Sequence, residues 1–301
     1  MLKVFKDDAL QAAMERDGFV VVPFYTNDEV EYLLQQFYEL HQSDVSGFFS
    51  STFSFDTHYR EKANEVIMKV CQRAMEELLL DYKAFCACYL VKASDDNSAL
   101  CVHQDMSLVD ERVFSGFNIW VPLIDLNETN GPLQVLPGSH RIYPTLRGST
   151  IPGIYEETDD YLRKYLKTLY LHAGQAVIFD QSIIHASPNN VSGKLRPVTN
   201  TFFTHKDARI RICYYEKSLN KIELFDEEDS FMTEYVNFGY DIHSRPSIGT
   251  SLGYVDYDFP KLTKEQLDQI YADPNAVEET ETTPVKTSPK KKSFLRKLLN
   301  I

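Results

Sequence analysis

Apolar positions in the first 80 residues recur with the period of an α-helix. Residues 5–17 predict a short helix that ends at Gly18, and the run FVVVPF after it predicts a strand. Thr26 and Glu29 have the spacing of a capping box, so a second helix is expected to begin there. A third helix is predicted from about residue 61 to residue 80. The apolar side chains of the second helix share one face: Val30, Leu33, Leu34, Phe37 and Leu40.

From residue 85 onward the pattern changes to short β-branched or aromatic runs separated by turn residues. The runs are AFCACYLVK, GFNIWVPLIDL, PLQVLP, GQAVIFD, VTNTFFTH and RIRICYYE. Many short strands with turn residues between them predict an antiparallel sandwich or barrel. The charged segment 155–170 predicts a surface helix within an insertion. The aromatic-rich segment 221–270 fits core packing better than the lining of a pocket.

Composition narrows the class of protein and its surroundings. The chain has 301 residues, 43% of them hydrophobic, and a formal net charge of −13, which argues against a general nucleic-acid binder. No apolar run approaches ~18 residues, so no membrane span is expected. The five cysteines form no C-x-x-C pair, and the start of the chain lacks the apolar region of a signal peptide. A reducing, cytoplasmic location is therefore predicted.

The segment LCVHQDMSLVD places His103 and Asp105 two residues apart at an expected strand end, where residues i and i+2 share a face. The pair fits half of a metal site, an acid/base pair or a chance arrangement. A mononuclear non-haem iron site needs two histidines and one carboxylate, and His185 is the best third candidate. Arg196 follows His185 by eleven residues, and two adjacent antiparallel strands would bring its guanidinium near the metal. It would suit a dicarboxylate, and Ser187 would add a hydroxyl.

Other polar residues within the predicted strands have weaker assignments. A second H-x-D, His205 with Asp207, is followed by His243, but no arginine follows at a comparable spacing, so this set is disfavoured. Asn118 and Gln134 fit either a cavity lining or satisfied core amides. Core packing is expected for Trp120 and loop ordering for His140.

The ordered set of motifs resembles the phytanoyl-CoA dioxygenase family over roughly residues 10–215. The set comprises H-Q-D, WVPLIDLNETNGPLQVLPGSH, H-x-S with the later arginine, and the opening ERDGFVVVPFYTNDEVEYLLQQF. The resemblance implies a mainly β double-stranded β-helix (a jelly-roll, cupin-like fold) with flanking helices. It implies Fe(II) bound by His103, Asp105 and His185, and 2-oxoglutarate as cosubstrate bound by Arg196 with help from Ser187. Tyr89 and Lys92 are candidates for further contacts with 2-oxoglutarate.

These expectations describe an Fe(II)- and 2-oxoglutarate-dependent dioxygenase that uses O2 to hydroxylate a small organic molecule. Residues 1–272 are expected to form one oxygenase domain, with a core at about 10–215 and a C-terminal extension at 216–272. Residues 273–301 are expected to form a disordered basic tail. The alternatives are a non-catalytic small-molecule binding module on the same cupin-like barrel and a metal-dependent hydrolase that uses a bound water. The sequence does not specify the substrate, the oxidised position or the oligomeric state.

Overall fold

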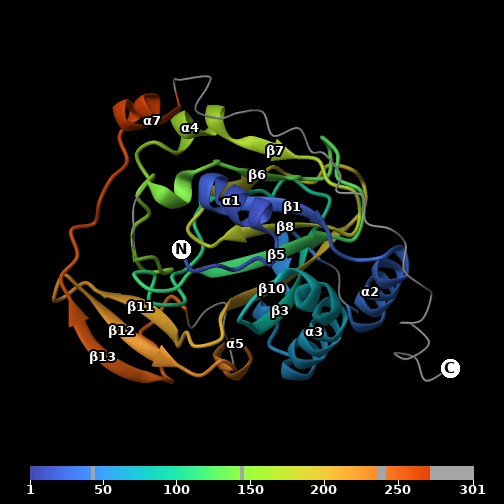
Figure 1. Ribbon diagram of the computed structural model, residues 1–301, viewed down its shortest axis with the longest axis horizontal. Coiled ribbons are helices and arrows are strands. Elements are labelled where there is room, and N and C mark those ends of the chain that lie inside the picture. Colours follow the sequence, from blue (N-terminus) through green and yellow to red (C-terminus); the bar gives the residue numbers. More distant parts are fainter. Residues whose placement is uncertain (42–44, 143–145, 236–241, 272–301) are drawn as a thin grey trace.

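Two antiparallel β-sheets face each other at the centre of the computed structural model (Figure 1), which describes residues 1–41, 45–142, 146–235 and 242–271. The larger sheet contains, in spatial order, β1 (Phe19–Pro23), β8 (Gln175–Asp180), β5 (Gly116–Pro122), β10 (Arg196–His205), β3 (Tyr82–Lys92) and β2 (Phe48–Ser50). The smaller sheet contains β4 (Leu100–His103), β9 (His185–Ser187), β6 (Leu133–Val135) and β7 (Lys167–Leu169).

The connections between β3 and β10 define the topology. The chain crosses from one sheet to the other at each step, except that β6 and β7 pair as neighbours within the smaller sheet. This alternation winds eight strands into a double-stranded β-helix of the jelly-roll type. The predicted mainly β fold with flanking helices is therefore confirmed.

Three helices precede the double-stranded β-helix. Asp7 caps α1 (Asp8–Asp17), which starts three residues later than predicted, and Gly18 ends it with a φ of 80° that favours glycine. A Cβ at Gly18 would also collide with His140, whose predicted role in ordering its loop fits this contact. The predicted capping box begins α2 (Asn27–Leu40). The third helix, α3 (Thr57–Leu78), starts four residues earlier than predicted because Asp56 caps it.

Helices α2 and α3 cover the outer face of the larger sheet (Figure 1). The main hydrophobic core lies between these helices and the sheet. Leu33 and Phe37 of α2 pack there against Tyr89 and Val91 of β3. Leu90, between those two strand residues, points to the other face of the sheet. A second cluster fills part of the space between the two sheets: Trp120, Leu133, Val135, Val177 and Phe179.

The charged insertion forms less helix than predicted. Only a short helix, α4 (Asp159–Leu162), and a 3-10 turn, η3 (Arg163–Tyr165), lie within residues 155–170. Residues 155–158 form turns, and Lys167–Leu169 is a strand that pairs with β6, with Leu169 opposite Leu133. Two further 3-10 turns are η1 (Ser51–Phe53) and η2 (Ser139–Arg141).

The chain that follows β10 adds a separate three-stranded sheet beside the double-stranded β-helix (Figure 1), and this sheet begins before residue 216, where the extension was expected to start. It contains β11 (Ile210–Glu216), β12 (Lys221–Glu227) and β13 (Thr250–Val255), with helices α5 (Phe231–Glu234) and α7 (Lys264–Tyr271). Phe225, Phe231 and Tyr235 are buried, which confirms packing as their role. Phe238, Tyr240 and the predicted tail at 273–301 lie outside the described residues.

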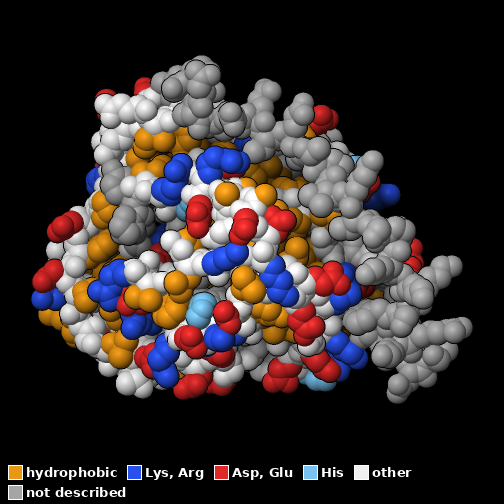
Figure 2. Space-filling view, viewed as in Figure 1, with side chains coloured by type: hydrophobic (Ala, Val, Ile, Leu, Met, Phe, Trp, Pro, Cys, Tyr) orange, Lys and Arg blue, Asp and Glu red, His pale blue; other side chains and the backbone are white. Residues whose placement is uncertain are grey.

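The surface carries charges of both signs. On the face shown in Figure 2, basic and acidic side chains are interspersed rather than separated into patches of one sign. Among the helices in the described part of the chain, none is both long and apolar enough to cross a membrane.

We expect Leu33→Ala to destabilise the fold by about 2–5 kcal/mol, because Leu33 is 0% exposed in the core between α2 and β3. Tyr38→Ala, at a 60% exposed position of the same helix, should change stability by less than about 0.5 kcal/mol. Urea unfolding monitored by circular dichroism measures both values. Equal effects at the two positions would contradict the described packing of α2.

Candidate metal and cosubstrate site

The three predicted metal ligands converge where β4 and β9 of the smaller sheet end. These strands pair so that His103 lies opposite His185, and the two ring centroids are 4.0 Å apart. Asp105 follows β4, and its backbone amide donates to the Gln181 carbonyl at 3.0 Å. Oδ1 of Asp105 lies 3.9 Å from Nε2 of each histidine. Of the described residues, only this trio has its donor atoms grouped within 4.8 Å as a metal ion requires.

The hydrogen bonds of both imidazoles leave the correct nitrogen free for a metal. Nδ1 of His103 lies 2.8 Å from the Cys101 carbonyl, and Nδ1 of His185 lies 3.0 Å from the Ile183 carbonyl. Because a carbonyl oxygen only accepts, each Nδ1 carries the proton and each Nε2 has a free lone pair. Burial, together with the neighbouring His185, lowers the pKa of His103 and favours the neutral ring that metal binding needs.

Two amide side chains orient the carboxylate of Asp105. The Asn118 amide donates from Nδ2 to Oδ2 of Asp105, and Oδ1 of Asn118 accepts from Nε2 of Gln181 at 3.2 Å. This relay occupies Oδ2 and leaves Oδ1 facing the imidazoles. Asn118 therefore both lines the cavity and is satisfied, so the two roles left open by the sequence both apply. Gln181 was not predicted.

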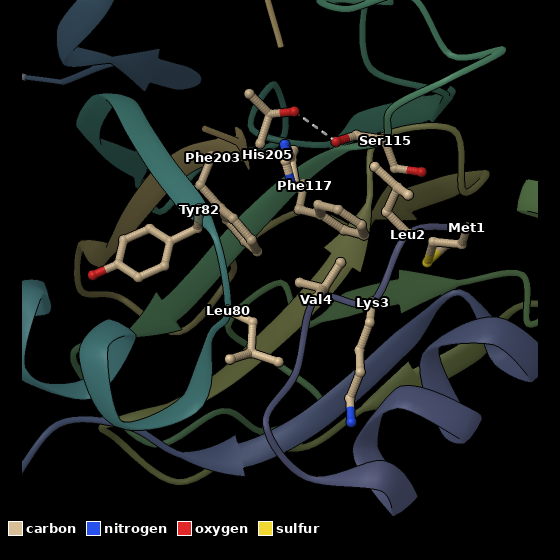
Figure 3. Close-up of a pocket in the computed structure, with 11 residues that line it drawn as sticks. Met1, Leu2, Lys3, Val4, Leu80, Tyr82, Ser115, Phe117, Phe203 and His205 are labelled. Atoms are coloured by element: carbon tan, nitrogen blue, oxygen red, sulfur yellow. Dashed lines mark hydrogen bonds between the residues drawn. The ribbon is translucent and has the colours of Figure 1, made fainter. Parts of the chain in front are cut away.

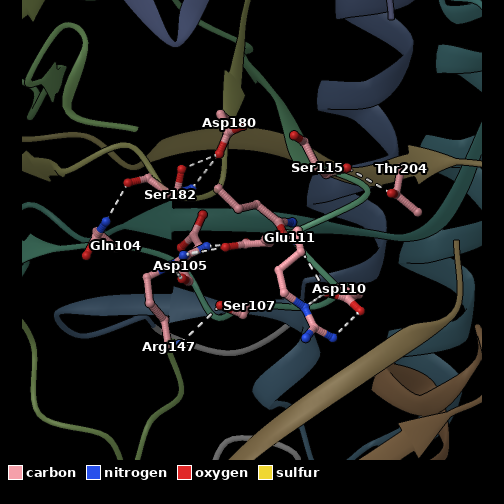
Figure 4. Close-up of polar contacts among 12 residues, drawn as sticks. Gln104, Asp105, Ser107, Asp110, Glu111, Ser115, Arg147, Asp180, Ser182 and Thr204 are labelled. Atoms are coloured by element: carbon pink, nitrogen blue, oxygen red, sulfur yellow. Dashed lines mark hydrogen bonds and ion pairs between the residues drawn. The ribbon is translucent and has the colours of Figure 1, made fainter. Parts of the chain in front are cut away.

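A buried ion pair fixes the chain segment that carries Asp105 (Figure 4). Nε of Arg147 donates to the Asp105 carbonyl at 2.8 Å, and the guanidinium pairs with the Glu111 carboxylate. The Arg147 amide also donates to the Ser107 hydroxyl at 3.1 Å. Burial raises the pKa of Glu111, while Arg147 opposes this shift. This pair was not predicted, because its members lie in separate loops and have no local sequence signal.

Arg196 enters the same cavity from the larger sheet. The expectation that it would lie on a strand adjacent to His185 is wrong, because β9 and β10 belong to facing sheets. The guanidinium is 2% exposed and lies 5.3 Å from the centre of the Trp120 ring. Within the described structure its Nε and Nη1 have no hydrogen-bond partner. Burial lowers its pKa to about 9. A buried cation in this state requires an anionic ligand.

Ser187 and Trp120 line this cavity, so Trp120 contacts the site as well as the core. The two suggested further contacts with 2-oxoglutarate do not reach it. The Tyr89 hydroxyl donates to the Leu33 carbonyl at 3.0 Å, on the helix side of β3. Lys92 donates to the carbonyls of Ser98, Ser187 and Pro188. Burial, reinforced by the nearby Arg196, lowers the pKa of Lys92 to about 7.

The cavity has a volume of about 350 Å³, and its lining is apolar apart from the groups named above and the side chains of Ser50, Thr52 and Asn200. A second hollow, beside the N-terminal residues (Figure 3), has a volume of about 10 Å³, which is room for about one water molecule. The disfavoured ligand set does not form a site: His205 lies 3.6 Å from Asp207, whereas His243 lines a different hollow beside Tyr214.

The fold and the donor set are typical of mononuclear non-haem iron oxygenases, in which two histidines and one carboxylate leave coordination positions open. The chain belongs to the phytanoyl-CoA dioxygenase family, whose sequence profile matches residues 14–198.

Curated relatives and a solved structure agree with this family. A phytanoyl-CoA dioxygenase of Arabidopsis thaliana is 28% identical over 123 residues, which are 40% of this chain and 44% of the relative. An ectoine dioxygenase of Bordetella bronchiseptica is 33% identical over 90 residues, which are 24% of this chain and 28% of the relative. The chain thus spans less than half the length of either. The non-haem alpha-ketoglutarate-dependent carbocyclase SnoK from nogalamycin biosynthesis shares the fold, with a TM-score of 0.54, 16% identity, and coverage of 68% of this chain and 86% of SnoK.

We expect Asn118→Leu to weaken Fe(II) binding by about 10–100-fold, because Oδ2 of Asp105 would lose its donor. Gln181→Glu should act in the same direction, since a carboxylate would attract Nδ2 of Asn118 away from Asp105. Gln134→Leu, which removes an amide bonded to Thr168 outside the cavity, is the control. Competition with a metal-sensitive dye measures the affinities. Unchanged affinity in Asn118→Leu would show that the relay does not orient the carboxylate.

Proposed function

We propose that the protein is an Fe(II)- and 2-oxoglutarate-dependent dioxygenase that hydroxylates a small organic molecule. The observation that carries this proposal is the presence, in one cavity, of the three donor side chains and a buried guanidinium without an anion. The donor set fits Fe(II). The guanidinium fits the distal carboxylate of 2-oxoglutarate, which would restore charge balance. Family membership supports the same activity.

Each residue of the site has a defined task in this proposal. His103 and His185 would bind iron through Nε2, and Asp105 through Oδ1, where its charge offsets part of the charge of the metal. Arg196 would hold the distal carboxylate of 2-oxoglutarate, and the Ser187 hydroxyl would donate to the same group. Bound iron and 2-oxoglutarate would supply the oxidation of a C–H bond by O2, with release of succinate and carbon dioxide. The apolar lining would exclude water from the reacting atoms.

The two alternative functions use only part of the site. A non-catalytic binding module would use the apolar cavity but would not need two imidazoles with free Nε2 atoms beside a carboxylate. A hydrolase with a metal-bound water would have no use for a buried guanidinium that lacks an anion. The proposed cytoplasmic location fits the five cysteines, all of which are free thiols.

A substrate library incubated with the protein, Fe(II), 2-oxoglutarate and O2 tests the activity directly. We expect succinate and a hydroxylated product in equal amounts, with the new oxygen atom derived from O2. Product formed without consumption of 2-oxoglutarate would indicate the hydrolase. Binding of library members with neither succinate nor product would indicate the binding module.

His103→Ala and His185→Ala should each abolish stoichiometric Fe(II) binding while the fold survives, because each removes one of three proposed ligands. His172→Ala is the matched control, since this histidine is 83% exposed on the surface. Metal analysis of the purified proteins gives the iron content, and circular dichroism gives the melting temperature. A full equivalent of tightly bound iron in either site variant would refute the ligand assignment.

Arg196→Met should weaken 2-oxoglutarate binding by about 2–4 kcal/mol and leave Fe(II) bound, because a charge-assisted pair is lost. Methionine preserves much of the buried volume. Arg209→Met, which breaks an exposed pair with Asp226, should leave the affinity unchanged. Calorimetric titration of the iron-loaded proteins without oxygen measures both effects. Equal 2-oxoglutarate affinity in Arg196→Met and the native protein would place the distal carboxylate elsewhere.

A further inference from the structure

We propose that the substrate of this site is a neutral, mainly apolar molecule, and that residues beyond the matched family region select it. The inference rests on the proposed function, because it concerns the part of the cavity that iron and 2-oxoglutarate would leave free. It follows from three properties of the described cavity wall: its charges, the origin of its apolar side chains and one unsatisfied amide.

Each charged side chain of the described cavity lining already has a role in binding iron or 2-oxoglutarate under the proposed function. Among the described residues that line it, the side chains able to carry charge are His103, Asp105, His185 and Arg196. The first three would bind iron, and the last would bind the cosubstrate. No charged side chain in the described lining then remains to pair with a charge on the substrate. A carboxylate or ammonium group in this space would lose its hydration without gaining a partner.

The apolar wall combines residues that follow Asp105, one residue of β10 and two residues of the C-terminal segment. It includes Met106, Leu108, Phe202, Met232 and Ile242, which also belong to one hydrophobic cluster. The last three lie beyond residue 198, where the family match ends. Specificity would therefore depend in part on residues outside the matched family region. The two methionines have flexible side chains that can adapt to an apolar surface.

The position of Met232 is fixed by the helix layer. Arg60 of α3 donates to the backbone carbonyls of Thr233 at 3.3 Å and Tyr235 at 2.5 Å. These bonds hold α5 against α3, and Met232 of α5 is only 4% exposed. The part of the apolar wall that α5 contributes is therefore packed in place.

Besides Arg196, one other polar side chain of the described cavity wall has an atom without a hydrogen-bond partner. Asn200 is 2% exposed, and its Oδ1 has no hydrogen-bond partner within the described structure. The hydroxyls of Ser50 and Thr52, which line the same cavity, bond to each other at 2.7 Å and not to this oxygen. A buried unsatisfied acceptor favours a ligand that brings a donor. The favoured substrate therefore carries a hydroxyl or an amide N–H on an otherwise apolar frame.

Three eight-carbon probes test the charge preference: 1-octanol, octanoate and octylammonium. Each is titrated by calorimetry, without oxygen, into the full chain loaded with Fe(II) and saturating 2-oxoglutarate. We expect 1-octanol to bind at least tenfold more tightly than either ion. Equal binding of the three probes, tighter binding of an ion, or no binding of 1-octanol would overturn the inference.

Variants of the wall add a second readout. Met232→Lys should reverse the preference, so that octanoate binds more tightly than 1-octanol; Ile242→Lys serves the same purpose if Met232→Lys does not fold. Leu252→Lys is the matched control, because this residue of β13 is 51% exposed and outside the cavity, and it should keep the native preference. Asn200→Leu should weaken 1-octanol binding about tenfold without changing 2-oxoglutarate affinity. A lysine variant that folds but still prefers 1-octanol would contradict the role of the wall.

Competition with 2-oxoglutarate separates failure of this inference from failure of the proposed function. Without 2-oxoglutarate, octanoate should bind at Arg196 and be displaced when 2-oxoglutarate is added, whereas 1-octanol should remain bound. If 2-oxoglutarate displaces octanoate but the saturated protein still prefers an ion over 1-octanol, only the substrate inference fails. If 2-oxoglutarate neither binds nor displaces octanoate, the proposed function fails.

Discussion

The pairing of β4 with β9 is the interaction on which the candidate site depends. It places His103 opposite His185, although a large part of the double-stranded β-helix separates them in sequence. Asp105 is tied to the same region by its backbone bond to Gln181, just before β9. The relay from Gln181 through Asn118 then orients the carboxylate from the facing sheet. Strand register therefore brings the two imidazoles together, and hydrogen bonds to its backbone and side chain place Asp105 beside them.

Uncompensated charge is the second constraint on the site. Lys92 of β3 and Arg196 of β10 lie directly opposite each other, and both are buried. Lys92 satisfies its ammonium with three backbone carbonyls, but Arg196 has buried nitrogen atoms without acceptors in the described structure. Such an arrangement costs folding free energy unless a ligand completes it. The fold thus tolerates a local destabilisation where the proposed cosubstrate would bind.

The sequence predicted the β-rich fold and singled out the three residues that the fold brings together, because those features have local signals: H-x-D at a strand end, a histidine after an apolar run, and regular turn residues. It did not predict toward which face of a strand a particular side chain points. Strand β3 is apolar on both faces, so the sequence alone could not show that Tyr89 points to the helices and Leu90 to the cavity. The 155–170 segment contains less helix than predicted, because pairing with β6 outweighed its helical composition.

The sequence also did not point to three residues of the site and its wall, because their partners are distant in sequence: Arg147, Gln181 and Met232.

Anomalous diffraction at the iron absorption edge is the most direct test of the central claim, that this cavity binds iron and 2-oxoglutarate together. Crystals grown without oxygen, in the presence of Fe(II) and 2-oxoglutarate, would show both components. The account predicts one strong iron peak bounded by Nε2 of His103, Nε2 of His185 and Oδ1 of Asp105. It also predicts a carboxylate of 2-oxoglutarate on the guanidinium of Arg196. An iron peak elsewhere, or a cosubstrate carboxylate without contact to Arg196, would contradict it.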